Sequence, residues 1–463
     1  MEQGGMQKTA RAASGILVRV AILVVSTQIL LGFFWILMNF SSFQELGESY
    51  FFLEIQKNLV CDEYVGILYP LIMRIATGVT SVLPLPAHCL LYALQLTVAV
   101  FAARFFWSRF SGYGQWPLYL KLCLILGMVT FPVAEQCHLA VLPISLTASL
   151  YLISVGLLIQ KSDRPGVTLT RFGLLWLAET LLMPEYYLFG GILMGIFVLR
   201  EFSKAFYVIL IAAVFCAGIP ILSGWTSRDG ALGRMRQTPE AVAMRRLAWD
   251  SYGDFYPDWP TELREALTQE EIAQINAWPE QALWVFGQKV DARYGEKKAR
   301  EIYGTVAKAA QRLRRSENAK DVIKDVLCYS LVPASRLVLM AGKGNHATLQ
   351  RMNYEAMRAN APKFTSLYVR YDGLSFLCLL GLCGLWMVIR LIKGNRQERW
   401  VMIKNALIFA VTAGVVVIYY TLQAGGCMDE KRSLPVMALW MAWFCKMIAD
   451  VLNREKQETE NGK

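Results

Sequence analysis

Long apolar segments recur along this chain, and they constrain its fold more than any other feature. Of the 463 residues, 55% are hydrophobic and 18% are charged, whereas soluble domains have about 45–50% apolar and about 25% charged residues. Several segments are long enough for a helix that crosses a bilayer, which takes about 20 apolar residues. We therefore predict an all-α fold, a polytopic helical bundle in a membrane.

The distribution of Lys and Arg orients these segments. We predict about ten spans with both termini in the cytoplasm, because every short basic loop then lies on the cytoplasmic side, as the positive-inside rule requires. The first apolar stretch is too long for the h-region of a cleavable signal peptide. The predicted single spans are 16–40, 86–107, 118–135, 141–160, 205–223, 367–392, 401–422 and 434–452.

The segment 172–199 supplies the other two helices. As one helix it would place Arg200 and Lys204 on the outer side, against the positive-inside rule. Pro184-Glu185 stands at its middle, and proline interrupts a helix. We predict two short helices of about 12–14 residues each, too short to cross a bilayer alone. They meet in a hairpin whose turn lies in a protein-lined pocket at the outer face.

The chain divides into three predicted parts. An N-terminal transmembrane module covers 1–224 and includes an outer loop at 41–83, an extracytoplasmic insert covers 225–366, and the last helices with a cytoplasmic tail cover 367–463. Within the outer loop, residues 67–83 have the apolar spacing of a helix, with Arg74 in the middle. This pattern predicts an amphipathic helix at the outer membrane interface.

The insert is predicted to be mainly helical. Helix-start signals occur at Thr261 and again from Thr268 to Glu271. Residues 289–325 combine helical apolar spacing with alternating charges. The apolar run 326–341 is too short to span, so we predict a helix that dips into the outer leaflet.

Composition and missing motifs exclude several function classes. The formal net charge is +11, but the basic residues lie largely in short loops, so the charge reflects membrane orientation and not nucleic-acid binding. The sequence lacks a phosphate-binding lysine loop, an Asp-x-Asp pair and zinc-type Cys/His spacing. The substrate is therefore expected to arrive on or within the membrane. Four cysteines are predicted to face outward, their pairing left open: Cys61, Cys137, Cys328 and Cys427.

The outer loop after the first span is acidic. It holds Glu45, Glu48, Glu54, Asp62 and Glu63 against a single Lys57. Carboxylates are costly to hold near lipid, so their gathering at this surface indicates a function.

Four segments together carry a resemblance to a known family. They are Asp62-Glu63, Tyr69-Pro70-Leu71-Ile72-Met73-Arg74, Leu182-Met183-Pro184-Glu185-Tyr186 and Lys431-Arg432-Ser433-Leu434-Pro435. In this order, and on one predicted membrane face, they resemble the GT-C superfamily of integral membrane glycosyltransferases, in particular the dolichyl-phosphate-mannose–protein mannosyltransferases. The resemblance covers about residues 14–200 and 401–452 and does not extend to the insert.

This resemblance implies a reaction at the extracytoplasmic face of a plasma membrane. A sugar would pass from a polyprenyl-phosphate carrier to an envelope lipid, polymer or protein acceptor. An outer-loop carboxylate would take the proton of the acceptor hydroxyl as the new bond forms. Asp62, Glu63 and Glu48 are the candidates, and the sequence leaves the choice between them open.

The resemblance also implies roles for basic and aromatic residues. Arg432, with Lys431, is predicted to stabilise the departing lipid phosphate, because the guanidinium group suits phosphate oxygens. Arg74 is a further candidate for the donor phosphate, although its side chain could instead extend to the interface. The predicted substrate-binding residues are Tyr69, Glu135, His138 and Glu185.

No metal site or cofactor is assigned, although Glu48, Asp62, Glu63 and Glu135 could supply oxygen ligands to a divalent cation. The expected partners are the lipid-linked donor, membrane lipids and an acceptor whose identity stays open. The alternative function is a transporter or flippase of an envelope lipid or polymer, with the same carboxylates as a proton or substrate site. The absence of two matching halves in the sequence argues against this alternative.

Overall fold

The computed structural model describes helices and the turns that join them. The described residues are 19–34, 66–82, 89–110, 112–130, 137–159, 162–202, 238–248, 259–277, 285–313, 315–331, 362–423 and 430–437, with isolated positions at 16, 37, 206, 439–440, 443–444 and 447–451. Among these residues there is no β-strand. The predicted all-α class is thereby confirmed for the described part of the chain.

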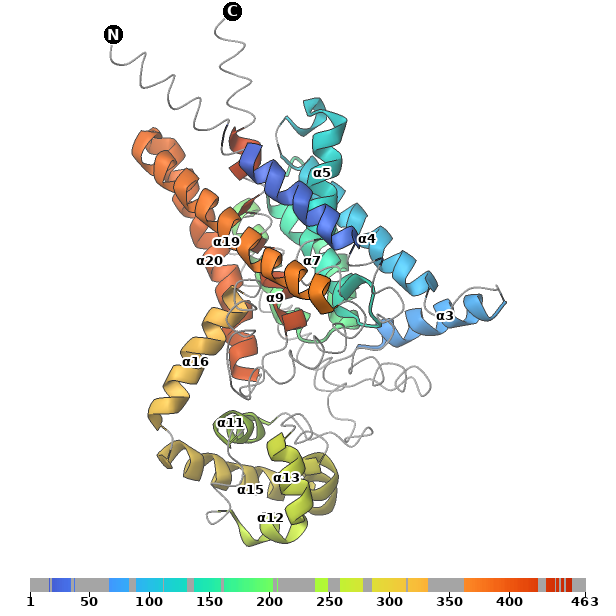
Figure 1. Ribbon diagram of the computed structural model, residues 1–463, viewed down its shortest axis with the longest axis vertical. Helices are drawn as coiled ribbons and strands as arrows, with labels where there is room; N and C mark the ends of the chain where they lie inside the picture. Colours follow the sequence, from blue (N-terminus) through green and yellow to red (C-terminus); the bar gives the residue numbers. More distant parts are fainter. Residues whose placement is uncertain are drawn as a thin grey trace, which may run out of the picture. The chain divides into compact units, whose positions relative to one another are not determined.

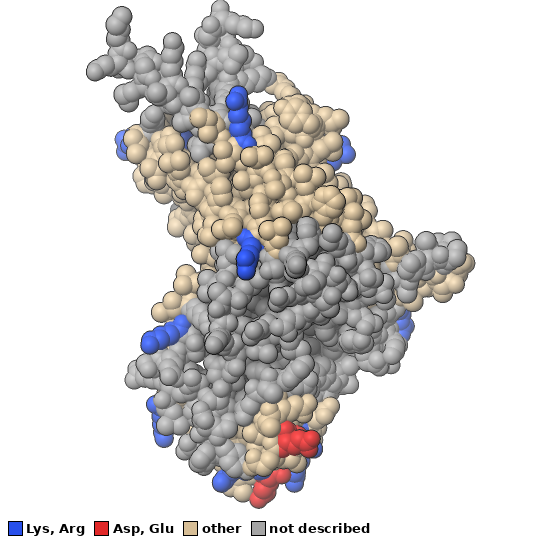
Figure 2. All heavy atoms as spheres, in the orientation of Figure 1, with Lys and Arg blue, Asp and Glu red and all other residues tan. Residues whose placement is uncertain are grey.

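Three of the described helices are long and apolar enough to cross a membrane. They are α4 (Cys89–Ser108), α19 (Pro362–Lys393) and α20 (Arg396–Gln423). Shorter apolar helices cover Arg19–Phe34, α3 (Leu68–Val82), α5 (Leu118–Val129) and α7 (Ile144–Ile159). On α19 and α20 many large apolar side chains are exposed, and Figure 2 shows a broad surface with few charged groups over this part. Outward-facing apolar side chains are the pattern of lipid-facing helices.

The chain forms two compact units. The first comprises Met1–Leu222, Ala356–Gly414 and Leu434–Lys463, and the second comprises Ser223–Glu355 and Val415–Ser433. The second unit thus groups the end of α20 with the helices of the insert.

In the first unit, α7 is the central helix. It is apolar on all sides and buried along most of its length, as expected of a helix enclosed by neighbours. It packs against α4, α8 (Pro165–Leu182) and α9 (Tyr186–Glu201), while α5 and α3 pack against α4 (Figure 1). Gly156 permits a close crossing, because a Cβ there would contact the Phe105 ring at 3.2 Å.

The predicted hairpin is confirmed as α8 and α9, joined by a short turn at Met183–Glu185. The predicted lengths are wrong, because α8 has 18 residues and α9 has 16. For α8 the reason is Pro165, which stands at the first position of this helix. Proline favours that position, since its fixed φ suits the helix and its missing N–H has no partner there.

The second unit contains the helices of the insert. They are α11 (Pro239–Ala248), α12 (Thr261–Ala266), α13 (Gln269–Ala277), the π-helix η4 (Gly287–Asp291), α15 (Ala292–Leu313) and α16 (Arg315–Ser330). Their shared core includes Met244, Trp259, Leu263, Phe286 and Val306. The predicted helical character of the insert is confirmed for these residues.

Local signals account for several helix boundaries in the insert. The Thr268 side chain accepts a hydrogen bond from the Glu271 amide at 3.2 Å, and Glu271 Oε2 accepts one from the Thr268 amide at 2.9 Å. This is a capping box at the start of α13. Gly295 interrupts α15 with φ 73° and ψ 169°, a backbone conformation open essentially to glycine alone.

The prediction that a separate helix starts at residue 326 is wrong. Residues 326–330 are the last part of α16, which begins at Arg315, because the helical pattern continues through this boundary without a breaker. Tyr329 near the end of α16 stacks on Tyr420, with ring centroids 6.0 Å apart. Beyond Leu331 the predicted segment lies outside the described residues.

Candidate functional site

The start of α3 lies against the end of α8. The Gly66 amide donates a hydrogen bond to the Leu182 carbonyl at 3.1 Å. A Cβ at position 66 would overlap the carbonyl group of Leu181, so this approach requires glycine. Two segments of the sequence motifs, which are more than one hundred residues apart, thereby meet in the first unit.

Next to this junction, a buried glutamine gathers two of the predicted substrate-binding residues. Tyr69 on α3 donates its hydroxyl to Gln95 Oε1 on α4 at 3.3 Å. Gln95 Nε2 donates to the carbonyls of His138 at 2.8 Å and Ala140 at 3.0 Å. The His138 ring is itself hydrogen-bonded to Ser145, with 2.7 Å between Nδ1 and Oγ. Tyr69 and His138 are therefore parts of one buried polar network.

A second buried polar group lies on α8, one turn before the hairpin turn. Glu179 on α8 is fully buried, and its Oε1 accepts a hydrogen bond from Ser154 on α7 at 2.8 Å. Tyr186, the first residue of α9, packs edge-on against Tyr151 with ring centroids 5.9 Å apart.

Glu185 occupies the turn as predicted. It is 7% exposed and precedes the first helical residue of α9. Its carbonyl accepts a hydrogen bond from the Leu188 amide at 3.2 Å. Glu185 is thus enclosed by protein, whereas a pocket at the outer face stays a prediction.

Sequence reasoning missed Gln95, Glu179 and Ser154. A signal for the first two was present, since each is a polar residue inside an apolar helix, where burial without a purpose is unfavourable. Ser154 had no such signal, because serine is common in apolar helices.

Of the remaining predicted residues, the structure describes the side chains of Arg74 and Arg432. Arg74 is exposed on α3 beside Leu71 and Ile75, whereas Tyr69 is on the buried face, because five helical residues rotate the side chain by about 140°. Arg432 is half-buried in the 3-10 helix η6 (Glu430–Ser433) of the second unit, which also contains Lys431. Asp62, Glu63, Glu48 and Glu135 lie outside the described residues.

No group of three or more His, Cys, Asp or Glu side chains among the described residues could hold a metal ion. Of the four cysteines whose pairing was open, Cys137 is described and is buried. The other three side chains lie outside the described set.

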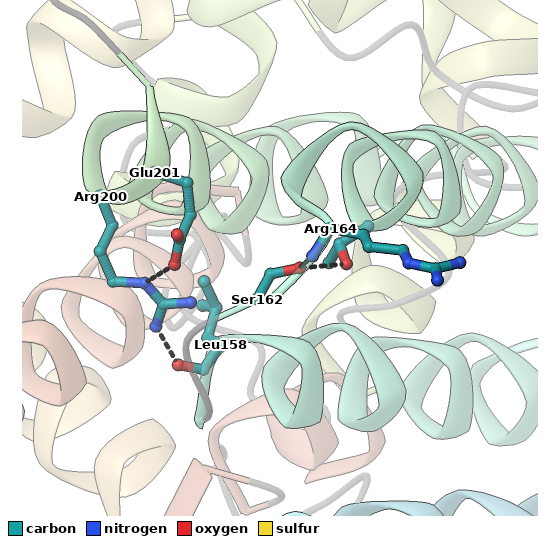
Figure 3. A network of polar contacts seen from close by, with 6 residues as sticks. Leu158, Ser162, Arg164, Arg200 and Glu201 are labelled. Carbon is teal, nitrogen blue, oxygen red and sulfur yellow. Dashed lines mark hydrogen bonds and ion pairs between the residues drawn. The ribbon is translucent and has the colours of Figure 1, made fainter.

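The opposite end of the hairpin carries a different set of contacts (Figure 3). Arg200 bonds Glu201 Oε1 at 2.7 Å and donates to the Leu158 carbonyl, while Ser162 accepts from the Arg164 amide at 3.2 Å. An apolar cavity of about 170 Å³ adjoins this end, lined by residues that include Leu158, Leu193, Ile408, Trp443 and Arg200. This cavity is separate from the turn that contains Glu185.

The chain matches no family model, no curated protein and no solved structure.

Proposed function

We propose that this chain is an integral membrane glycosyltransferase. It transfers a sugar from a polyprenyl-phosphate carrier to an envelope lipid, polymer or protein acceptor on the extracytoplasmic face of the plasma membrane. The proposal includes about ten spans, cytoplasmic termini and an extracytoplasmic insert. Three long apolar helices and the exposed apolar faces of α19 and α20 support the membrane part of the proposal.

The observation that carries the proposal is the contact between α3 and the hairpin. Asp62 and Glu63 precede Gly66 by four and three residues in the sequence, and the Gly66 amide is bonded to Leu182 at the end of α8. This contact supports a shared site for the acidic motif, the Tyr-Pro-Leu helix and the Pro-Glu turn. A site made from separate motifs is what a transferase with a lipid-linked donor and a second substrate needs.

The proposed chemistry assigns a base and a polar wall. Asp62 or Glu63, with Glu48 as the alternative, takes the proton of the acceptor hydroxyl. The wall that orients the sugar includes Tyr69 and His138, which the Gln95 network holds together. It also includes Glu185 at the α8–α9 turn. The phosphate-stabilising role of Arg432 and Lys431 is a prediction from their motif.

The test uses the full-length protein in lipid nanodiscs with a panel of radiolabelled polyprenyl-phosphate sugars. The readout is the release of free polyprenyl phosphate by the wild type and by the double variant Asp62→Asn/Glu63→Gln. Loss of a general base lowers the rate by about 10²–10⁴-fold. The matched control is Asp163→Asn, an exposed acid on the loop before α8, which should leave release unchanged.

The outcomes test the identity of the base separately from the glycosyltransferase activity. Full release by the double variant would exclude both acids as the base, and Glu48→Gln then tests the alternative. No binding and no release by the wild type across the panel would refute the glycosyltransferase.

One observation favours a second candidate function, a transporter or flippase. Glu179 is an ionisable group buried among helices, and such groups in membrane proteins often bind protons during transport. Proton uptake coupled to lipid movement in liposomes, abolished by Glu179→Gln, would support this candidate.

A further inference from the structure

Glu179 requires an explanation that the sequence motifs do not provide. Its Oε1 accepts the hydrogen bond from Ser154, whereas its Oε2 is buried and has no hydrogen-bond partner among the described residues. The buried hydroxyl of Tyr186 is likewise without a hydrogen-bond partner in that part of the chain. Unsatisfied buried polar groups are rare in native proteins and usually have a structural or functional reason.

The free side of the carboxyl group lies against a glycine of α9. A Cβ at Gly190 would be 2.5 Å from Glu179 Oε2 and 2.9 Å from Trp176 Cδ1. The Trp176 indole donates a hydrogen bond to the Tyr187 carbonyl at 2.9 Å. Glu179 and Trp176, one turn apart on α8, therefore contact the first two turns of α9.

The same glutamate also ends α8 and faces α7. Its carbonyl accepts a hydrogen bond from the Met183 amide at 2.8 Å, the last before the turn. On α7, Ser154 bonds the Glu179 side chain, and Tyr151 one turn earlier packs on Tyr186. Contacts from α7 thus reach both sides of the turn that carries Glu185.

We propose that Glu179 is a positioning residue that holds the α8–α9 turn, and with it Glu185, at the start of α3. It acts as a neutral, hydrogen-bonded group, because burying an isolated carboxylate is strongly unfavourable. The junction it supports is the hydrogen bond between Gly66 and Leu182. This inference deepens the proposed function and rests on it only for the role of Glu185 with substrate.

The test is hydrogen exchange of the full-length protein in nanodiscs, followed at the amides of Tyr186, Tyr187 and Leu188. Glu179→Ala removes the acceptor of Ser154 and should speed exchange at the turn by about tenfold or more. Glu179→Gln keeps the shape, an acceptor and neutrality, so exchange should stay near the wild-type rate. Near wild-type exchange in Glu179→Gln would show that the position needs the shape and the acceptor of the side chain and not a negative charge.

Two controls keep the result interpretable. Glu201→Ala removes a glutamate whose side chain is 3% exposed at the other end of the hairpin, and it should not change exchange at the turn. Gly190→Ala, used if Glu179→Ala does not fold, displaces the carboxyl group without removing it and should also speed exchange. Its matched control is Gly195→Ala, since a Cβ there has nothing within 4 Å.

Each outcome decides the proposal. Unchanged exchange at the turn in Glu179→Ala or Gly190→Ala would overturn the positioning role. If exchange in Glu179→Gln is as fast as in Glu179→Ala, the claim that Glu179 acts in its neutral form is refuted. That result would favour the transporter. Because exchange does not require sugar transfer, a wild type that shows neither donor binding nor release of polyprenyl phosphate across the panel refutes the proposed function without affecting this test.

Discussion

Replacing Gly66 by alanine tests how α3 meets the α8–α9 hairpin. The added Cβ would overlap the backbone carbonyl of Leu181. A backbone carbonyl cannot rotate away like a side chain, so the start of α3 has to move from the end of α8. That movement breaks the hydrogen bond from the Gly66 amide to Leu182.

The expected loss of stability follows from these two effects. A lost intramolecular hydrogen bond costs about 0.5–1.5 kcal/mol, and overpacking of a well-packed contact costs about 1–3 kcal/mol. Together they predict that Gly66→Ala lowers the free energy of unfolding by about 1.5–4.5 kcal/mol. Since the proposed site includes this junction, the release of polyprenyl phosphate should also fall by about tenfold or more.

The assay is unfolding of the purified protein in mixed micelles with increasing SDS, followed by tryptophan fluorescence. The matched control is Gly78→Ala on the same helix, where a Cβ has nothing within 4 Å. This change should be neutral or stabilise α3 by up to about 1 kcal/mol, because alanine is a better helix former than glycine. Equal unfolding midpoints for the two variants would refute the close contact between α3 and α8.

Four further predictions concern other parts of the two units. Thr268→Ala should destabilise α13 by about 1 kcal/mol through loss of the capping box, seen as faster proteolysis of the insert, and an unchanged rate would contradict the cap. The hydrogen bond from the Thr268 amide, with a smaller effect of Lys289, lowers the pKa of Glu271 below 4.5. Its stabilising effect should therefore be present above pH 4.5 and lost as the pH falls through the lowered pKa, and Glu271→Gln should flatten that acid dependence. Gln95→Leu should destabilise the first unit by about 1–3 kcal/mol in the SDS assay, because buried carbonyls lose their donor, and a midpoint at or above the wild type would refute the network. Trp176→Phe should cost about 1 kcal/mol through loss of the indole hydrogen bond, while Trp176→His, which can still donate from a ring nitrogen, should recover part of it.

Much of the fold follows from patterns within a few residues. The apolar run at 86–107 predicts a helix, and α4 occupies Cys89–Ser108. Pro184 predicts the interruption between α8 and α9, and Thr268 with Glu271 predicts the start of α13. These predictions succeed because apolar periodicity, proline and capping side chains act on the backbone within about four residues.

Predictions made at a larger scale were less accurate. Both hairpin helices are longer than predicted. For α8 the reason is that Pro165 starts the helix ahead of the apolar segment. Arg74 and Tyr69 belong to one motif in the sequence but lie on different faces of α3. A motif read as a string does not state which of its residues share a face, and the helical rotation decides that.

The sequence by itself determined that this chain is helical, where several helices begin and end, and which residue types stand in the acidic, Tyr-Pro-Leu and Pro-Glu motifs. The tertiary structure alone decided that Gln95 joins Tyr69 to His138 and that Ser154 bonds Glu179. These partners are 25 to 43 residues apart in the sequence. The physical reason is that a buried polar group must find a partner wherever helix packing brings one. That packing depends on side chains from several helices at once, which no local pattern specifies.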